Sequence, residues 1–230
     1  MKWLTGLDQK RKEILALLIW SFTWNYIVYF GARLIAKTWY HADITSNVDM
    51  MIPFIPWTVI IYIGWYVFWG VNYGLCAAQE DAVRTRLFCA DTIAKAICLV
   101  IFLLFPTTNI RPEVADTGIL DKLIQLVYYL DNPDNLFPSI HCMVSWLCWI
   151  GVRGRKNIPL WYRGFSLLVA VAICISTLTT KQHVLIDVVG GIAIAEGCYL
   201  IAAIPKVQAC FSKIIESFFR MLRIKGKTEK

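Results

Sequence analysis

His183 and Asp187 stand four residues apart in an otherwise apolar stretch, and Lys181 precedes the histidine by two residues. On a helix that begins at His183, this spacing places the imidazole and the carboxylate on one face, where the carboxylate can accept a hydrogen bond from one ring nitrogen. The other nitrogen then stays basic and can attack an electrophile. A hydrogen-bonded pair that only joins two helices is the alternative, and the two residues by themselves fit either role.

The composition indicates a membrane protein. Hydrophobic residues make up 58% of the 230 positions, charged residues only 17%, and the mean hydropathy is +0.56, which excludes an ordinary soluble domain. Ten tryptophans and ten tyrosines fit aromatic belts at two membrane interfaces. The eight cysteines have no metal-ligand spacing and are interpreted as free thiols that pack as small hydrophobic residues. We expect one integral-membrane domain over residues 1–230.

Apolar segments recur along the chain and predict an all-α polytopic membrane fold. Six transmembrane helices are expected, at residues 14–36, 52–75, 88–105, 139–152, 165–179 and 183–204. In the loop between the third and fourth helices, residues 118–130 have an amphipathic pattern, which predicts an interfacial helix. Residues 206–230 alternate apolar and basic positions and predict an amphipathic basic tail on an anionic cytoplasmic leaflet, with a disordered basic tail as the alternative.

The basic residues indicate the orientation, because cytoplasmic segments carry an excess of lysine and arginine. Both termini are expected in the cytoplasm, and no nucleic-acid partner is needed to explain the net charge of +7. The cytoplasmic segments would hold Lys2, Lys10, Arg11, Lys12, Arg84, Arg86, Arg153, Arg155, Lys156, Arg163, Lys206, Lys213, Arg220, Arg223, Lys225, Lys227 and Lys230. The opposite side would hold Arg33, Lys37, Arg111, Lys122 and Lys181.

This topology gathers polar side chains on the outer face of the membrane. The gathered residues are Arg111, Ser139, His141, Lys181, His183 and Asp187. A guanidinium matches a phosphate group with paired hydrogen bonds, an ammonium adds a point charge, and the start of a helix adds backbone N–H donors. Ser139 and Asn135 could instead only cap the helix that follows them. The pattern predicts a phosphate ligand.

Three motifs follow one another within residues 106–191, namely Arg111-Pro112, Pro138-Ser139-Ile140-His141, and Ser176 followed by His183-x-x-x-Asp187. In this order they resemble the motifs of the type 2 phosphatidic acid phosphatase superfamily. The stretches Asp131-Asn132-Pro133-x-Asn135-x-Phe137-Pro138-Ser139-Ile140-His141 and Lys181-Gln182-His183 are similar to the branch that contains bacterial relatives of inositol phosphorylceramide synthase. The predicted topology places the active site on the extracytoplasmic face, and the resemblance implies a bacterial plasma membrane.

The resemblance also implies the roles of the site residues. His183 would attack phosphorus and form a phosphohistidine while Asp187 orients it, and His141 would act as the general acid and base. Arg111 and Ser139 would bind the phosphate, with Asn135 and Gln182 as neighbours that support them. The family's usual lysine and arginine are Leu104 and Thr177 here, and Lys181 is expected to replace one of the two missing cations. No metal and no cofactor is expected.

The predicted function is therefore a membrane lipid phosphatase or phosphotransferase, a metal-independent enzyme whose substrate is a lipid phosphate or lipid diphosphate. The acceptor can be water or an alcohol, because either can discharge a phosphohistidine. One alternative is a proton-coupled transporter or lipid translocase with His183, Asp187 and Glu196 as a relay. Another is a metal site built from His41, His141, His183 and Asp187.

Two further charges fall inside predicted membrane helices. Lys95 lies in the third and Glu196 in the sixth, at comparable depths. Intramembrane charges usually pair, so we predict a Lys95–Glu196 salt bridge, with an Asp91–Lys95 contact as the competitor.

Overall fold

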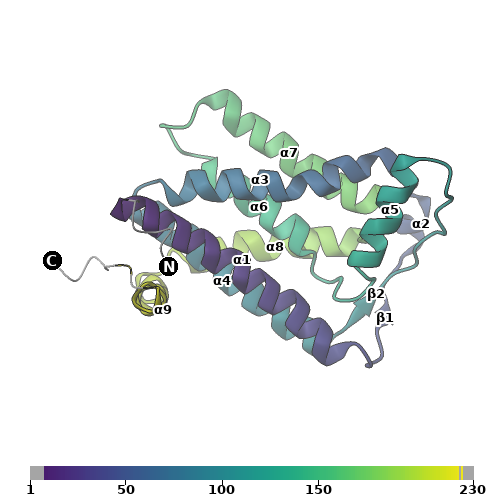
Figure 1. Cartoon of the computed structure of the whole chain (residues 1–230), viewed down its shortest axis with the longest axis horizontal. Helices are drawn as coiled ribbons and strands as arrows, with labels where there is room; N and C mark the ends of the chain where they lie inside the picture. The colour runs from purple at the N-terminus through teal and green to yellow at the C-terminus, as the bar shows by residue number, and fades with distance from the viewer. Residues whose placement is uncertain (1–7, 223, 225–230) are drawn as a thin grey trace.

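The computed structural model describes residues 8–222 and 224, and this part of the chain is built almost entirely of helices (Figure 1). In chain order the elements are α1 (Gln9–Ala36), β1 (Ala42–Asp43), α2 (Asn47–Met51), the short 3-10 helix η2 (Pro56–Thr58), α3 (Val59–Ala77), α4 (Asp81–Leu104), β2 (Thr107–Thr108), α5 (Ile119–Leu130), α6 (Ile140–Val152), α7 (Leu160–Thr179), α8 (Leu185–Ile201) and α9 (Pro205–Met221). Some of the basic residues predicted to be cytoplasmic lie outside the described residues, namely Lys2, Arg223, Lys225, Lys227 and Lys230.

The long helices form a bundle with α6 near its centre. Helix α6 packs against α3, α7 and α8, while α4 packs against α1 and α8. At one end of the bundle lie α2, α5 and the short parallel pair β1–β2, in which Ala42 is opposite Thr107. Helix α9 lies at the other end (Figure 1). The loops and short elements at the first of these ends position the polar residues discussed below.

Apolar side chains cover the outside of the bundle as well as its core. Leu34, Val67, Leu104, Leu168 and Leu200 are all exposed, as expected for helices that face lipid. Four helical segments, namely α1, η2 with α3, α4 and α7, are long and apolar enough to cross a membrane, and α8 with α9 makes a fifth only if this pair, bent by 97°, is counted as one span. The all-helical, integral-membrane prediction is confirmed.

All six segments predicted to span the membrane are helical, but their boundaries differ from the prediction. Helices α4 and α7 begin at Asp81 and Leu160, earlier than expected. A polar first turn continues α4 beyond its apolar part, and in α7 the residues Leu160 to Gly164 extend the helix across Arg163. The last predicted helix begins too early: α8 starts at Leu185, so His183 precedes the helix instead of opening it. Val184 is extended there, and its N–H donates to the Asp187 carboxylate at 3.0 Å.

The predicted Lys95–Glu196 salt bridge is wrong, and the competing contact is present. The Lys95 ammonium lies 2.9 Å from the Asp91 carboxylate one turn away on α4, and Ser21 and Tyr73 donate hydroxyl hydrogen bonds to the same carboxylate. Glu196 accepts instead from the Arg153 guanidinium at 2.7 Å, because this long side chain reaches α8 from the end of α6.

Removing one member of the buried pair should destabilise the fold strongly. Asp91→Ala leaves the Lys95 ammonium, which has no exposed surface, without its counterion, and we expect a loss of about 3–5 kcal/mol in the free energy of unfolding. The double variant Asp91→Leu with Lys95→Met should recover most of this loss, because no isolated charge remains. Unfolding in detergent measures both. A double variant as unstable as Asp91→Ala alone would contradict this account.

Candidate active site

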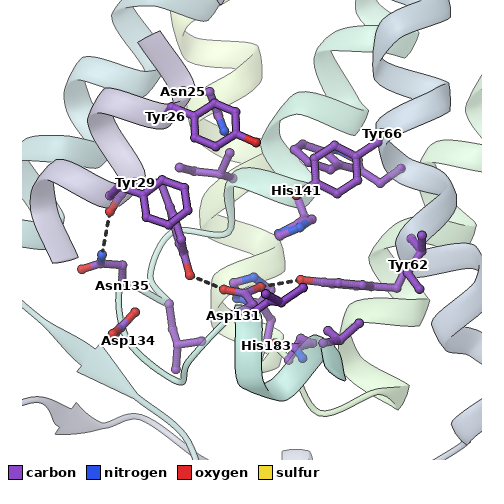
Figure 2. A pocket seen from close by; sticks show the side chains of 18 of the residues that line it. Asn25, Tyr26, Tyr29, Tyr62, Tyr66, Asp131, Asp134, Asn135, His141 and His183 are labelled. Atoms are coloured by element: carbon purple, nitrogen blue, oxygen red, sulfur yellow. Dashed lines mark hydrogen bonds between the residues drawn. The ribbon is translucent and has the colours of Figure 1, made fainter. Parts of the chain in front are cut away.

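A cavity of about 480 Å³ lies at the end of the bundle that carries α5 and the β pair. Polar residues from five segments line it, namely Tyr29, Tyr62, Arg111, Asp131, Asp134, Asn135, His141, Gln182 and His183 (Figure 2). The remaining lining is largely apolar. Tyr26, Phe30, Tyr66, Leu126 and Leu130 line the cavity and are also exposed on the outer surface. The cavity is therefore continuous with the lipid-facing surface between α1, α3 and α5.

His183 and Asp187 form the hydrogen-bonded pair predicted from their spacing, although the histidine precedes the helix. Nδ1 of His183 lies 3.1 Å from Oδ2 of Asp187, and the same oxygen accepts the N–H of Val184. A carboxylate can only accept, so Nδ1 carries the hydrogen and Nε2 keeps a lone pair. Within the described residues Nε2 makes no hydrogen bond, and the ring lines the cavity. It is the nitrogen free to react.

The loop between α7 and α8 holds this histidine in place. The N–H groups of Gln182 and His183 both donate to the carbonyl of Thr177, at 2.9 and 3.1 Å. Tyr128 donates to the carbonyl of Thr180, and Asn109 donates to that of Lys181. Lys181 itself has a φ of 56°, a left-handed conformation that costs a non-glycine residue free energy and persists because the surrounding contacts hold it.

The environment of His183 favours its protonated form. Burial disfavours the charged ring, but the hydrogen bond and the charge of Asp187 outweigh it and raise the pKa of His183 above its ordinary value of 6.5. The Asp131 carboxylate acts in the same direction. The reactive form of this side chain therefore becomes populated only at a higher pH than for a free histidine.

His141, in the first turn of α6, faces the same cavity. Its ring centre lies 5.8 Å from that of His183, and the rings of Tyr62 and Trp65 pack against it at 4.7 and 4.5 Å. Neither ring nitrogen of His141 has a hydrogen-bond partner among the described residues. Because the peptide N–H of Ser139 donates to the carbonyl of Asp187 at 3.1 Å, the segments that carry the two histidines are also joined directly. One small group can contact both imidazoles.

Arg111 and Gln182 supply hydrogen-bond donors to the cavity. The Arg111 guanidinium stacks on Tyr128, and it donates one bond to the carbonyl of Asp131 and one to the side-chain oxygen of Gln182, each at 2.7 Å. Its Nε and the amide nitrogen of Gln182 are buried without a partner in the described part of the chain. A guanidinium with two of its five N–H groups used is fixed in position and can still bind an anion.

The other predicted residues are placed differently. Lys181 lies away from the main cavity, because its ammonium donates to the carbonyls of Asp49 and Ile52 at 2.7 and 2.6 Å. Ser139 is fully buried, and its hydroxyl caps α6 by accepting the N–H of Cys142. Asn135 lines the cavity on the side of α1, and His41 bonds the carbonyl of Trp39 outside it. Among the described residues no group of three metal-binding side chains is arranged to hold an ion.

Three cavity residues were missed by sequence reasoning, namely Tyr29, Tyr62 and Asp131. The Asp131 carboxylate accepts hydrogen bonds from both tyrosine hydroxyls, at 2.6 Å from Tyr62 (Figure 2). Asp131 is the first residue of the Asp131-Asn132-Pro133 stretch that resembles the family branch, and its place in that motif could have identified it as a site residue. The two tyrosines gave no signal, because aromatic residues are common throughout membrane interfaces.

Gly191 is required where α8 crosses the start of α6. A Cβ atom at this position would lie 2.6 Å from the carbonyl oxygen of Ser139 and 3.1 Å from the N of Met143, and both are backbone atoms that cannot turn aside. We expect Gly191→Ala to cost about 1–3 kcal/mol of stability and to lower kcat/KM about 100-fold, because it moves His141 relative to His183. Gly197→Ala is the matched control on the same helix, since nothing lies within 4 Å of its Cβ position. Equal activity of the two variants would contradict the prediction.

Comparison with known proteins agrees with this geometry. The model of a PAP2 superfamily family matches residues 55–201, which include Arg111, His141, His183 and Asp187. No curated protein and no solved structure matches the chain. Since the match covers more than half of the 230 residues, the chain belongs to the PAP2 superfamily, and this membership indicates a phosphatase or phosphotransferase.

Proposed function

We propose that this protein is a lipid phosphatase or phosphotransferase that cleaves a phosphomonoester or diphosphate of a lipid through a phosphohistidine on His183. One observation carries the proposal: Arg111, His141 and His183 line a single cavity that is continuous with the lipid-facing surface. A lipid can keep its chains among Tyr26, Phe30 and the exposed side of α5 while its phosphate reaches the histidines.

In the first half-reaction the lone pair on Nε2 of His183 attacks phosphorus and forms a P–N bond. The P–O bond to the lipid breaks, and His141 donates a proton to the departing oxygen. Asp187 keeps the hydrogen on Nδ1 and stabilises the positive charge that develops on the ring. His141 is left neutral.

In the second half-reaction His141 takes a proton from an incoming hydroxyl, whose oxygen attacks phosphorus. The new P–O bond forms, the P–N bond breaks, and the electron pair returns to Nε2. The incoming hydroxyl belongs to water in a phosphatase and to an alcohol in a phosphotransferase. Arg111 and the Gln182 amide bind the non-bridging oxygens in both halves, and we propose that these fixed donors stabilise the transition state without a metal.

We further propose the arrangement in the membrane. The helices α1, α3, α4, α6, α7 and α8 would be six spans, α5 would lie at the extracytoplasmic interface, and both termini would be in the cytoplasm of a bacterium. Helix α9 buries Phe211, Ile215 and Phe219 against the bundle and would rest on the inner leaflet. The motif wording favours the branch related to inositol phosphorylceramide synthase. Glu196, the third member of the alternative proton relay, is held by Arg153, which disfavours the transporter alternative.

Trapping the intermediate tests the proposal. Detergent-purified His141→Ala protein, incubated with lipids labelled in the terminal phosphate, should accumulate acid-labile label on His183, and a variant that also carries His183→Ala should not. The panel comprises phosphatidate, phosphatidylglycerol phosphate and polyprenyl diphosphate, each measured with and without a chelator. Turnover with no label on His183 would reject the phosphohistidine, and loss of turnover with the chelator would reject the metal-free reaction.

A further inference from the structure

The cavity holds a carboxylate that the proposed chemistry does not use. Asp131 follows the end of α5, and its side chain lies between Tyr29 of α1 and Tyr62 of α3, each of which donates a hydroxyl hydrogen bond to it (Figure 2). Burial favours its neutral form, but nearby cationic groups and the two hydroxyl bonds lower the pKa of Asp131 below its ordinary value. An anion beside a phosphate-binding site repels phosphate, so this position needs another explanation.

The direction of these hydrogen bonds determines what Tyr29 and Tyr62 can bind. Each phenol has one hydrogen, and because the ionised carboxylate can only accept, both hydrogens are committed to Asp131. The two phenol oxygens therefore keep only lone pairs for a ligand. Nearby, Asn135 donates its side-chain amide to the carbonyl of Tyr29 at 3.3 Å, which fixes the orientation of the amide and leaves its Oδ1 buried without a partner among the described residues.

The cavity thus presents two chemically different sets of groups. Arg111 and Gln182 present hydrogen-bond donors, while Asp131 and the two phenol oxygens present acceptors. Phosphate oxygens are acceptors and need the first set. The second set needs a ligand with hydrogen-bond donors, and the Oδ1 of Asp134, a cavity residue, is a further acceptor without a partner within the described residues.

A hydroxyl meets this need without adding charge. Asp134 is already paired with Arg33 at 3.1 Å, and the Asp131 carboxylate already accepts from two phenols, so neither carboxylate needs a cation from the ligand. A neutral hydroxyl can donate to the acceptors that remain.

The leaving alcohol and the incoming alcohol occupy the same place in the reaction, because both oxygens lie opposite His183 and exchange a proton with His141. We propose that Asp131, Tyr29 and Tyr62 form the subsite for this alcohol and select phosphate esters that carry a free hydroxyl next to the esterified oxygen. This inference rests on the proposed function and names the substrate class within it. A plain alkyl or polyprenyl phosphate offers no such donor, and a diacylglycerol phosphate offers none either.

A matched pair of lipids tests the subsite. One is hexadecyl phosphate, and the other is its analogue with one extra hydroxyl on the second carbon, both in mixed micelles. The wild-type protein should turn over the hydroxylated lipid with a kcat/KM about 10-fold to 100-fold higher, as expected for one well-placed hydrogen bond to a charged or fixed group. Asp131→Asn and Tyr62→Phe should reduce this ratio towards one, and the exposed phenol variant Tyr129→Phe should keep it.

The outcomes distinguish failure of the proposed subsite from failure of the proposed reaction. A wild-type ratio near one, or an unchanged ratio in Asp131→Asn and Tyr62→Phe, would overturn the subsite while leaving the phosphohistidine intact. A greater preference for the analogue with an amino group in place of the hydroxyl would overturn the assignment to a neutral donor. Label on His183 in each variant, in the His141→Ala background, shows that the protein is folded and reactive. Absence of turnover and of label in the parent proteins would instead reject the proposed function.

Discussion

Replacing His183 by alanine is expected to reduce phosphate release to the uncatalysed rate, a loss of at least about 10,000-fold in kcat, comparable to the removal of other enzyme nucleophiles. Alanine provides no atom that can form a bond to phosphorus. Water cannot take over efficiently, because His141 would have to activate it without the covalent intermediate that divides the reaction into two steps. Rates with a lipid phosphate in detergent measure the effect.

The control for this variant is His41→Ala. His41 lies near the same end of the helix bundle as His183, but its ring bonds the carbonyl of Trp39 and does not line the cavity. We expect near wild-type rates for it. The fold should survive His183→Ala, because the Val184 N–H still donates to Asp187 and the loop contacts to Thr177 are made by backbone atoms. Residual activity above one tenth of wild type in the His183 variant would mean that another residue attacks phosphorus.

Local relationships in the sequence predicted much of the fold and of the site. The apolar segments predicted the helices, because burial in lipid leaves few other choices. The spacing of His183 and Asp187 predicted their hydrogen bond, although the helix starts two residues later than expected. This contact survives the error because Asp187, in the first turn of α8, can reach both the Val184 N–H and the ring that precedes it.

Contacts between distant segments could not be predicted in the same way. Tyr29 and Tyr62 are 102 and 69 positions from Asp131, and nothing local indicates that α1 and α3 converge on the end of α5. Lys181 was expected at the phosphate from its position alone. Its left-handed backbone instead directs the side chain to the carbonyls at the end of α2. Its ammonium therefore contributes to the position of the loop that carries His183.

The pH dependence of Asp187→Asn follows from the environment of His183. In the wild-type protein Nε2 must be unprotonated to attack, so kcat/KM should rise with pH through the pKa of His183, which lies above 6.5. An asparagine removes the negative charge and the charge-assisted hydrogen bond while the burial remains. The pKa of His183 then falls, and the acidic limb of the profile moves to lower pH.

The same substitution should also lower the rate on the plateau. The Val184 N–H and Nδ1 of His183 share one oxygen of Asp187, so the side-chain oxygen of the introduced asparagine can accept both hydrogen bonds while its N–H₂ takes the position of the other carboxylate oxygen. The hydrogen then stays on Nδ1, but the negative charge that stabilises the imidazolium formed during attack is lost, and we expect a loss of about 10-fold to 100-fold in kcat, as for a charge-assisted hydrogen bond made neutral. The measurement is the pH profile of kcat/KM for wild type, for Asp187→Asn and for the control Asp116→Asn, whose carboxylate is exposed. Ionisation of the substrate affects all three profiles equally, so any difference between them comes from the enzyme. An acidic limb that stays in place, or moves to higher pH, in Asp187→Asn would show that Asp187 does not set the protonation of His183.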